Sequence, residues 1–192
     1  MSPRFMLVFI LTCTALTSGF SADKAQAQDF VWAPGFPAGS TIPLLDAPDQ
    51  HGQTQTLATL AGANGLVLFF NRSFDWCPWC KGQLKDLISM QSGFTQRGYG
   101  IATITYDPVA TLMEVAEDLD ISFALLHDEA VTHVNAYGIL NTDNAPDSFA
   151  YGVPQPGILI ISPQGIILAK FAEQNYRERP DLSWVLEQLD AL

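Results

Sequence analysis

The amino-acid sequence predicts one α/β domain with a central mixed, mainly parallel sheet flanked by helices and extended at its N-terminus by a hairpin. A chain of 192 residues, 48% of them hydrophobic, can bury one sizeable core but is too short for two ordinary domains. Apolar strand patterns alternate with helical ones along the chain, which is typical of a sheet with crossover helices on both faces. The last two strand patterns are joined by a connection too short for a crossover, so they form a hairpin.

The N-terminal half supplies the hairpin, one strand and one helix. Residues 28–41 are rich in Pro, Gly and Ala without periodicity, which indicates an extended lead-in, and we expect the domain itself to span 42–192. Asp49-Gln50-His51-Gly52 is typical of a turn between two short strands. The apolar run from Leu66 to Phe70 indicates a strand buried on both faces. After the segment WCPWC, apolar residues recur at helical spacing from Leu84 to Phe94.

The C-terminal half repeats this alternation. Residues 141–156 are polar and turn-rich, so we expect no regular element there. The expected elements on either side of that stretch are a strand at 100–106, a helix opened by Pro108, a strand at 122–126, a helix at 129–137, strands at 158–161 and 166–171, and a helix at 181–192.

The first residues have the layout of a secretory signal peptide. Arg4 precedes an apolar run from Phe5 to about Leu16, and small residues follow with an A-x-A pattern that ends at Ala27. We expect residues 1–27 to be removed by cleavage after Ala27, with Ala22 as the second choice, and the mature protein to be periplasmic or secreted. The run is shorter than the ~20 residues of a membrane-spanning helix, so no stable membrane embedding is expected after cleavage. An uncleaved anchor is the alternative.

Composition excludes two further classes. The charged fraction of 15% beside 48% hydrophobic residues is that of a folded globule and not of a disordered chain. The formal net charge of −11 would repel a phosphate backbone, so nucleic acid is not an expected partner.

The most informative feature is the cysteine pair Cys77 and Cys80. Cys13 lies inside the apolar run and leaves with the signal, so the mature chain has two cysteines in a C-x-x-C at a helix start, in a compartment where disulfides form. Helix N–H groups and the helix dipole lower the thiol pKa from about 8.5, which makes Cys77, near the exposed helix end, the expected nucleophile. Cys80, one turn in, would resolve the mixed disulfide.

Other interpretations of the pair are weaker. A purely structural staple would close too small a loop to gain much stability. A structural zinc site needs about four ligands, and covalent haem attachment needs His where Lys81 stands, so no metal or other cofactor is expected. The histidines His51, His127 and His133 are scattered along the chain, and a copper carrier would need one of them beside the cysteines.

The segment LVLFFNRSFDWCPWCKGQL resembles the active-site segment of the thioredoxin superfamily, and more closely its redoxin branch, the AhpC/TSA or peroxiredoxin-like family. Stretches such as LLDAPDQHGQTQTLATL, VNAYGIL and GVPQPGILIISPQG are similar to that family in the same order, over about residues 40–190. The resemblance implies a thioredoxin-like fold and thiol redox chemistry. It also implies a cis-proline that packs against the dithiol and offers backbone groups to the substrate, at Pro156 or, second, at Pro154.

The sequence departs from the family at three positions. Peroxidatic members have a threonine three residues before the first cysteine and an arginine that supports the thiolate, whereas Phe74 and Pro156 stand at those places here. Arg72 would supply the missing charge, unless it simply faces solvent. Thioredoxins also have a buried carboxylate as proton acceptor where this chain has Asn71, and an amide cannot take a proton.

These observations predict an exported thiol–disulfide oxidoreductase of the redoxin type, with an apolar rim of Trp76, Pro78 and Trp79 for its substrate. The expected partners are a disulfide-bearing protein or a small thiol or hydroperoxide, and an external electron donor such as a thioredoxin-like protein or a membrane reductase. One alternative is an atypical thiol peroxidase in which Cys77 becomes a sulfenic acid. The other is a non-catalytic binding or copper-handling module.

Overall fold

The computed structural model describes residues 30–192. The predicted signal peptide, 1–27, and its cleavage site after Ala27 lie outside the described residues. The elements in chain order are β1 (Asp46–Pro48), β2 (Thr54–Thr56), α1 (Leu57–Leu60), β3 (Gly65–Phe70), α2 (Pro78–Gln96), β4 (Tyr99–Thr105), α3 (Val109–Asp118), β5 (Ala124–His127), the 3₁₀ turn η1 (Glu129–Val131), α4 (Thr132–Ala136), β6 (Gly157–Ile161), β7 (Ile167–Phe171) and α5 (Leu182–Leu189).

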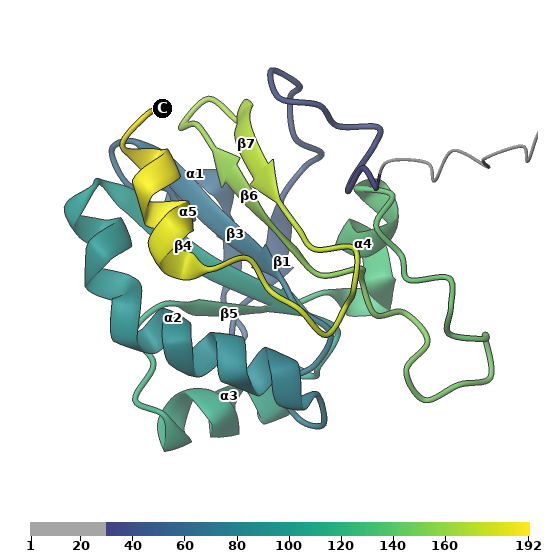
Figure 1. Cartoon of the computed structure of the whole chain (residues 1–192). Coiled ribbons are helices and arrows are strands. Elements are labelled where there is room, and N and C mark those ends of the chain that lie inside the picture. The colour runs from purple at the N-terminus through teal and green to yellow at the C-terminus, as the bar shows by residue number, and fades with distance from the viewer. Residues whose placement is uncertain (1–29) are drawn as a thin grey trace, which may run out of the picture.

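The central sheet has the strand order β5-β4-β3-β6-β7 (Figure 1). Strands β3, β4 and β5 run parallel, whereas β6 pairs antiparallel with β3 and with β7. The strands β1 and β2 form a separate hairpin around the turn at Asp49, whose carboxylate accepts hydrogen bonds from the N–H groups of His51 and Gln53. The mixed, mainly parallel sheet and its N-terminal hairpin are as predicted.

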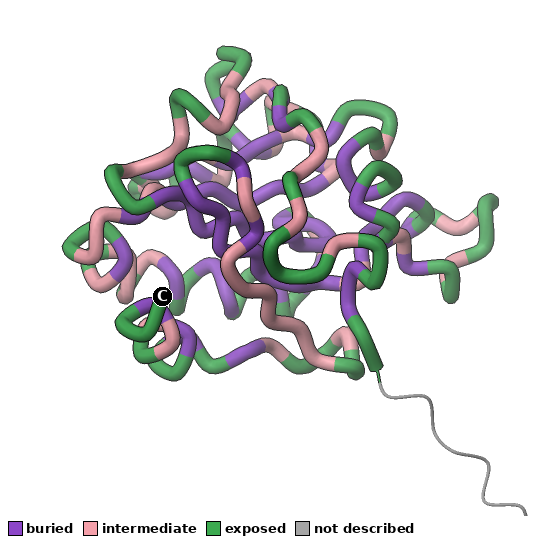
Figure 2. The backbone as a smooth tube through the Cα atoms, turned by 90° about the horizontal axis from the view of Figure 1, so that it is seen from above, coloured by how far each residue is buried: buried purple, intermediate pink, exposed green. Residues whose placement is uncertain are grey.

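Both faces of the sheet are covered, which explains the continuous apolar sequence of β3. Val67 and Phe69 point to one face, under α2, α3 and α5, and Leu66, Leu68 and Phe70 point to the other, under α1, α4 and the lead-in. All five side chains are fully buried, and each such burial stabilises the fold by about 1.5–3 kcal/mol. Figure 2 shows buried segments in the middle of the molecule, with most exposed segments around them.

The lead-in is a packed part of the domain and not a uniformly extended arm. Trp32 is 5% exposed, and its Nε1 donates a hydrogen bond to the carbonyl oxygen of Gln155 at 2.8 Å. The Nζ of Lys170 donates to the carbonyl oxygens of Trp32 and Ala33, and partial burial lowers the pKa of this ammonium group. The Trp32 ring lies where a Cβ at Gly157 would stand, so only glycine fits there.

The predicted helix over 129–137 is wrong in one respect, because the backbone breaks inside it. Ala130 and Val131 have positive φ of 53° and 59°, and they lie in the 3₁₀ turn η1, which is separate from α4. The carboxylate of Asp128 accepts hydrogen bonds from the N–H groups of His133 and Val134. This side chain therefore satisfies the free N–H groups of a new helix end and starts α4 later than the apolar pattern indicates.

One edge of the sheet gathers segments that are far apart in sequence. The parallel strands β3, β4 and β5 all end there, Gly157 at the start of β6 lies opposite Phe70 at the end of β3, and Phe171 at the end of β7 lies opposite Ile158. The segments after β3, β4 and β7 and the segment before β6 therefore meet at this edge. Within residues 30–192, no helix is both long and apolar enough to cross a membrane.

Candidate active site

Cys77 and Cys80 form a disulfide at the N-terminus of α2, with their Cα atoms 5.3 Å apart. Cys77 is the N-cap residue, Pro78 occupies the first helical turn, and the N–H of Cys80 donates to the Sγ of Cys77 at 3.3 Å. The backbone thus directs a donor and the positive end of the helix at the Cys77 sulfur, as the sequence predicted. These interactions favour a thiolate at Cys77 once the bond is reduced.

Both cysteines are fully buried, so the expectation that Cys77 stays at an exposed helix end is wrong for this state. Their side chains belong to the core cluster formed with Phe69, Phe74 and Leu84. The reason is geometric: Cys80 sits on the inward side of the first turn, and the disulfide draws the Cys77 sulfur toward it. Reaction with a client therefore requires approach over the residues around the bond.

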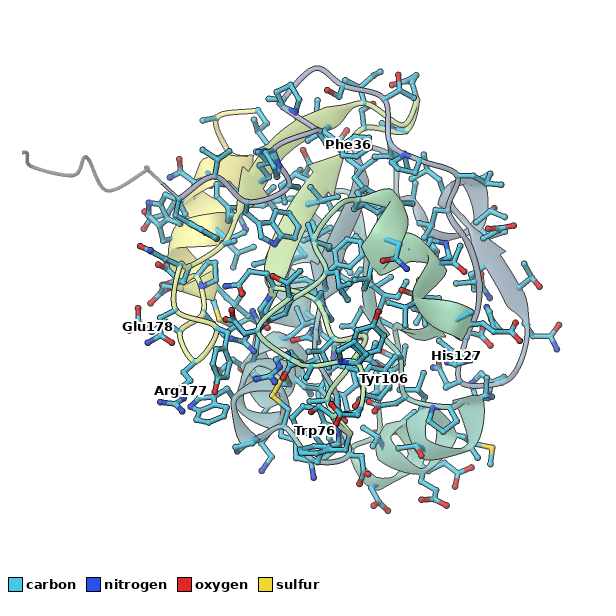
Figure 3. All side chains as sticks on the ribbon, turned by 90° about the vertical axis from the view of Figure 1, so that its right-hand side faces the viewer. Phe36, Trp76, Tyr106, His127, Arg177 and Glu178 are labelled. Carbon is cyan, nitrogen blue, oxygen red and sulfur yellow. A yellow bond between two sulfur atoms is a disulfide. The ribbon has the colours of Figure 1, made fainter. Side chains whose placement is uncertain are left out.

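Five aromatic residues contact one another beside the start of α2, where the disulfide lies. The Nε1 of Trp76 donates to the Tyr106 hydroxyl at 2.9 Å, and that hydroxyl donates to the carbonyl oxygen of Phe149 at 3.2 Å. The Trp76 and Phe149 rings meet edge to face, with centroids 5.1 Å apart. Trp79 is 39% exposed and stands beside Tyr176. In Figure 3 Trp76 and Tyr106 lie beside each other, and the turn-rich stretch before β6 passes them.

Arg72 is buried, so its solvent-facing interpretation is wrong. The side chain is 6% exposed, and its guanidinium carbon lies 4.3 Å from the ring centroid of Tyr176 and 5.1 Å from that of Trp76. Its Nε has no hydrogen-bond partner within residues 30–192. The cation is therefore held by aromatic faces rather than by a carboxylate.

Arg179 contacts the disulfide directly, whereas the sequence from Tyr176 to Arg179 indicates a solvated turn or a site for an anionic substrate. Its Nη2 lies 3.3 Å from the Sγ of Cys80, and its Nε donates to the Oε1 of Gln83 at 3.1 Å. Burial and, second, the charge of Arg72 lower the pKa of Arg179 to about 10, so it remains a cation at neutral pH. The sequence could have indicated this contact through the position of Arg179 after the last strand, because β7 returns the chain to the edge where α2 begins.

Asp107 fixes the loop that leads into Cys77. Its carboxylate accepts hydrogen bonds from the Ser73 hydroxyl at 2.7 Å, the Phe74 N–H at 2.5 Å and the Thr105 hydroxyl at 3.0 Å. Burial raises the pKa of Asp107 above its ordinary value, although the three donors lower it in part. The aspartate follows β4 as Ser73 follows β3, so the parallel strand ends bring the two together.

Asn71 and Pro156 lie at the same edge. The Oδ1 of Asn71 is buried without a hydrogen-bond partner within the described residues, and its side chain carries no carboxylate that could accept a proton. The expected cis bond at Pro156, or at Pro154, is wrong, because residues 30–192 contain no cis peptide. The N–H of Gln155 donates to the Ile139 carbonyl, and its own carbonyl accepts from Trp32. These backbone groups are thus already paired and are not offered to a substrate.

The histidines do not join the cysteines. His133 pairs with Asp128 at 2.9 Å, and the Nδ1 of His127 bonds to the backbone oxygen of Asp107. In the part of the chain that the structure describes, no three His, Cys, Asp or Glu side chains are grouped so that they could hold a metal ion.

Comparisons with known proteins agree with this fold. Residues 38–170 match the family model described as the AhpC/TSA family. No curated protein matches the sequence.

Among solved structures, peroxidoxin BcpB from Mycobacterium tuberculosis is similar with a TM-score of 0.71 and 20% identity, over 82% of this chain and 98% of that one. A mutant of peroxiredoxin 6 from Arenicola marina has a TM-score of 0.72 and 20% identity, over 81% and 73% of the two chains. A thiol peroxidase from Chromobacterium violaceum has a TM-score of 0.64 and 18% identity, over 81% and 87%. At these identities the likeness shows a shared fold.

Proposed function

The chain belongs to the AhpC/TSA family and has its thioredoxin-like fold, and on this premise we propose that it is an exported thiol–disulfide oxidoreductase that cycles Cys77 and Cys80 between dithiol and disulfide. The single observation that carries the proposal is the disulfide at the N-terminus of α2, with the Cys77 sulfur receiving a helix N–H. A disulfide of this kind gains little stability from its small loop, whereas its position activates the first sulfur.

The reaction follows from the two positions. In the reduced protein the Cys77 thiolate attacks one sulfur of a client disulfide, whose S–S bond breaks, and the leaving sulfur takes a proton from water. Cys80 then attacks the Cys77 sulfur of the mixed disulfide, which re-forms the Cys77–Cys80 bond and releases the second client thiol. An external electron donor, a thioredoxin-like protein or a membrane reductase, restores the dithiol.

The surface around the bond suits a disulfide-bearing protein or a small thiol. Pro78 and Trp79 are exposed, Trp76 is partly exposed, and Phe149 is 79% exposed above it. We assign client contact to Trp76, Pro78 and Trp79, because apolar rings around a reactive sulfur exclude water and hold an extended chain. Export to the periplasm or the medium is part of the proposal and is tested by fractionation of cells that express the full chain.

The decisive experiment follows exchange between the reduced protein and a model peptide disulfide by tryptophan fluorescence and mass spectrometry. Cys80→Ser is expected to accumulate a mixed disulfide at Cys77, and Cys77→Ser is expected to abolish exchange. A Cys77→Ser protein that exchanges as fast as the unmodified chain would falsify the assignment.

A thiol peroxidase is the second candidate. It is favoured by the Arg179 guanidinium beside the Cys80 sulfur, by the Arg72 guanidinium over the ring of Trp76 next to Cys77, and by the thiol peroxidase among the similar structures. The Cys77 thiolate would attack the peroxide, breaking its O–O bond and leaving a sulfenic acid and, after protonation, water or an alcohol. Cys80 would condense with the sulfenic acid and release water. Phe74, buried and apolar, stands where the peroxide-orienting threonine is expected. Stopped-flow mixing with hydrogen peroxide decides, because a rate no faster than that of free cysteine contradicts this candidate.

A further inference from the structure

Two buried or partly buried arginines lie near the start of α2 without a carboxylate partner, Arg179 beside the Cys80 sulfur and Arg72 over the Trp76 ring. The ion pairs within residues 30–192 involve Arg97 and His133, and neither Arg72 nor Arg179 takes part in one. Both arginines contact Tyr176, Arg72 through the ring and Arg179 through the carbonyl oxygen. The charge of Arg72 accordingly lowers the pKa of Arg179. Burying a cation is costly unless a negative group compensates for it. The pair therefore favours a negative charge on a group that it touches.

The position of Arg179 does not depend on the disulfide. Its Nε is bonded to the Gln83 side chain, and its Nη1 donates to the carbonyl oxygens of Tyr176 and Glu178. The remaining nitrogen, Nη2, is directed at the Sγ of Cys80. Because amide and carbonyl oxygens hold the guanidinium, it stays beside this sulfur when the bond is reduced.

Other charged groups at this edge are directed elsewhere. The Asp107 carboxylate is occupied by Ser73, Phe74 and Thr105, and Glu178 accepts from Asn175. The charged and titratable groups on the segments packed around the bond are Arg72, Asp75, Lys81, Lys85, Tyr106, Asp107, Tyr176, Arg177, Glu178, Arg179 and Asp181. Of these, Arg179 is the residue with a contact to the Cys80 sulfur.

We propose that Arg179, with Arg72 behind it, holds the Cys80 sulfur as a thiolate once Cys77 is joined to a client in the mixed disulfide, and thereby replaces the proton acceptor that Asn71 cannot be. The inference deepens the proposed function and rests on it for its role in catalysis. With the proton already gone, the Cys80 thiolate attacks the Cys77 sulfur of the mixed disulfide directly. The Cys77–client bond breaks, the Cys77–Cys80 bond forms, and the client sulfur leaves with the electron pair and takes a proton from water.

Arg179 is thus a positioning residue that acts through Cys80. It also stabilises the reduced form more than the disulfide, because only the reduced form carries the negative charge. The reduction potential is accordingly expected to be more oxidising with Arg179 present than without it.

The test uses the Cys77→Ser protein, in which Cys80 is the remaining thiol of the mature chain. Thiolate absorbance at 240 nm against pH gives the Cys80 pKa, which is expected below the ~8.5 of a free cysteine. Adding Arg179→Gln is expected to raise this pKa by ~1–3 units, as for loss of an opposite charge within 4–6 Å. Alkylation by iodoacetamide at pH 6.5 should slow ~10-fold or more. Arg179→Lys keeps the charge and should restore most of the shift.

Arg177→Gln is the matched control, because Arg177 is exposed on the same segment and lies over Trp79, 5.4 Å from the ring centroid. It removes the same charge without the sulfur contact, so the Cys80 pKa should stay close to that of the parent. A Cys80 pKa at or above 8.5 in the Cys77→Ser protein overturns the inference, whether or not the Arg179 variants fold. Equal shifts in Arg177→Gln and Arg179→Gln also overturn it.

The titration separates this inference from the proposed function, since it needs no turnover. If the Cys80 pKa shifts as expected but the unmodified protein exchanges no disulfides, the electrostatic role stands and the proposed function fails. If exchange depends on Cys77 but Arg179→Gln leaves the Cys80 pKa unchanged, the proposed function stands and this inference fails.

Discussion

Replacing Asp107 tests whether the loop before Cys77 depends on one buried carboxylate. The side chain is 2% exposed and accepts from the Phe74 N–H and from the hydroxyls of Ser73 and Thr105. In Asp107→Ala the hydroxyls can rotate toward other acceptors, but the buried Phe74 N–H cannot.

The magnitude follows from those three donors. An unsatisfied buried N–H costs about 1–3 kcal/mol, and each lost hydroxyl bond costs about 0.5–1.5 kcal/mol. Asp107→Ala should therefore lower the free energy of unfolding by ~2–6 kcal/mol, a large part of the ~5–15 kcal/mol of an ordinary domain. Asp107→Asn keeps one acceptor oxygen and should lose roughly half as much. Because Phe74 lies three residues before Cys77, exchange at Cys77 should slow in both variants.

Urea unfolding at several pH values measures this loss of stability and also tests the direction of the Asp107 pKa shift. Burial raises the pKa of Asp107, so the folded protein keeps a proton that the unfolded chain has lost. The contribution of Asp107 to stability is therefore fully present below the ordinary carboxyl pKa of about 4 and falls as the pH rises through the folded pKa. The stability advantage of the unmodified protein over Asp107→Asn should shrink across that window.

The matched control is Asp118→Asn on α3, an exposed carboxyl whose loss should change stability by no more than ~0.5 kcal/mol. Two results would refute the reasoning. One is an Asp107→Ala protein as stable as the unmodified chain, and the other is an advantage over Asp107→Asn that grows with pH.

Two further predictions concern packing around this edge. Gly157→Ala places a Cβ inside van der Waals contact with the Trp32 ring and should lower the free energy of unfolding by ~1–3 kcal/mol. The control Gly35→Ala meets nothing within 4 Å and should change the free energy of unfolding little. Equal urea midpoints for the two variants would contradict this prediction. Trp76→Phe keeps a ring but removes the donor to the Tyr106 hydroxyl, so it should cost about 0.5–1.5 kcal/mol and speed proteolytic cleavage between 141 and 156. A cleavage rate equal to that of the unmodified protein would show that the Trp76 bond does not hold this stretch.

Most helices and strands could be predicted from the sequence, because the apolar pattern that specifies each of them lies within its own segment. The continuous run of β3 specifies burial on both faces, and the spacing of Leu84, Leu87 and Phe94 specifies the inward face of α2. The helix over 129–137 was predicted too long, because its apolar pattern does not reveal that the Asp128 side chain caps a later start. The trans bond at Pro156 was not predicted either. The carbonyl oxygen of Gln155 beside this bond accepts a hydrogen bond from Trp32, 123 residues away.

The sequence by itself determined the mixed sheet and the placement of Cys77 and Cys80 at a helix start, because residue periodicity and the C-x-x-C spacing are properties of short segments. Only the tertiary structure decided which groups surround the disulfide. Arg179 lies 99 residues from Cys80 and Asp107 lies 33 residues from Phe74, and each contact forms because the strands end at one edge of the sheet. No local pattern encodes such a contact, since the pairing of β3 with β4 and with β6, and of β6 with β7, brings those segments together.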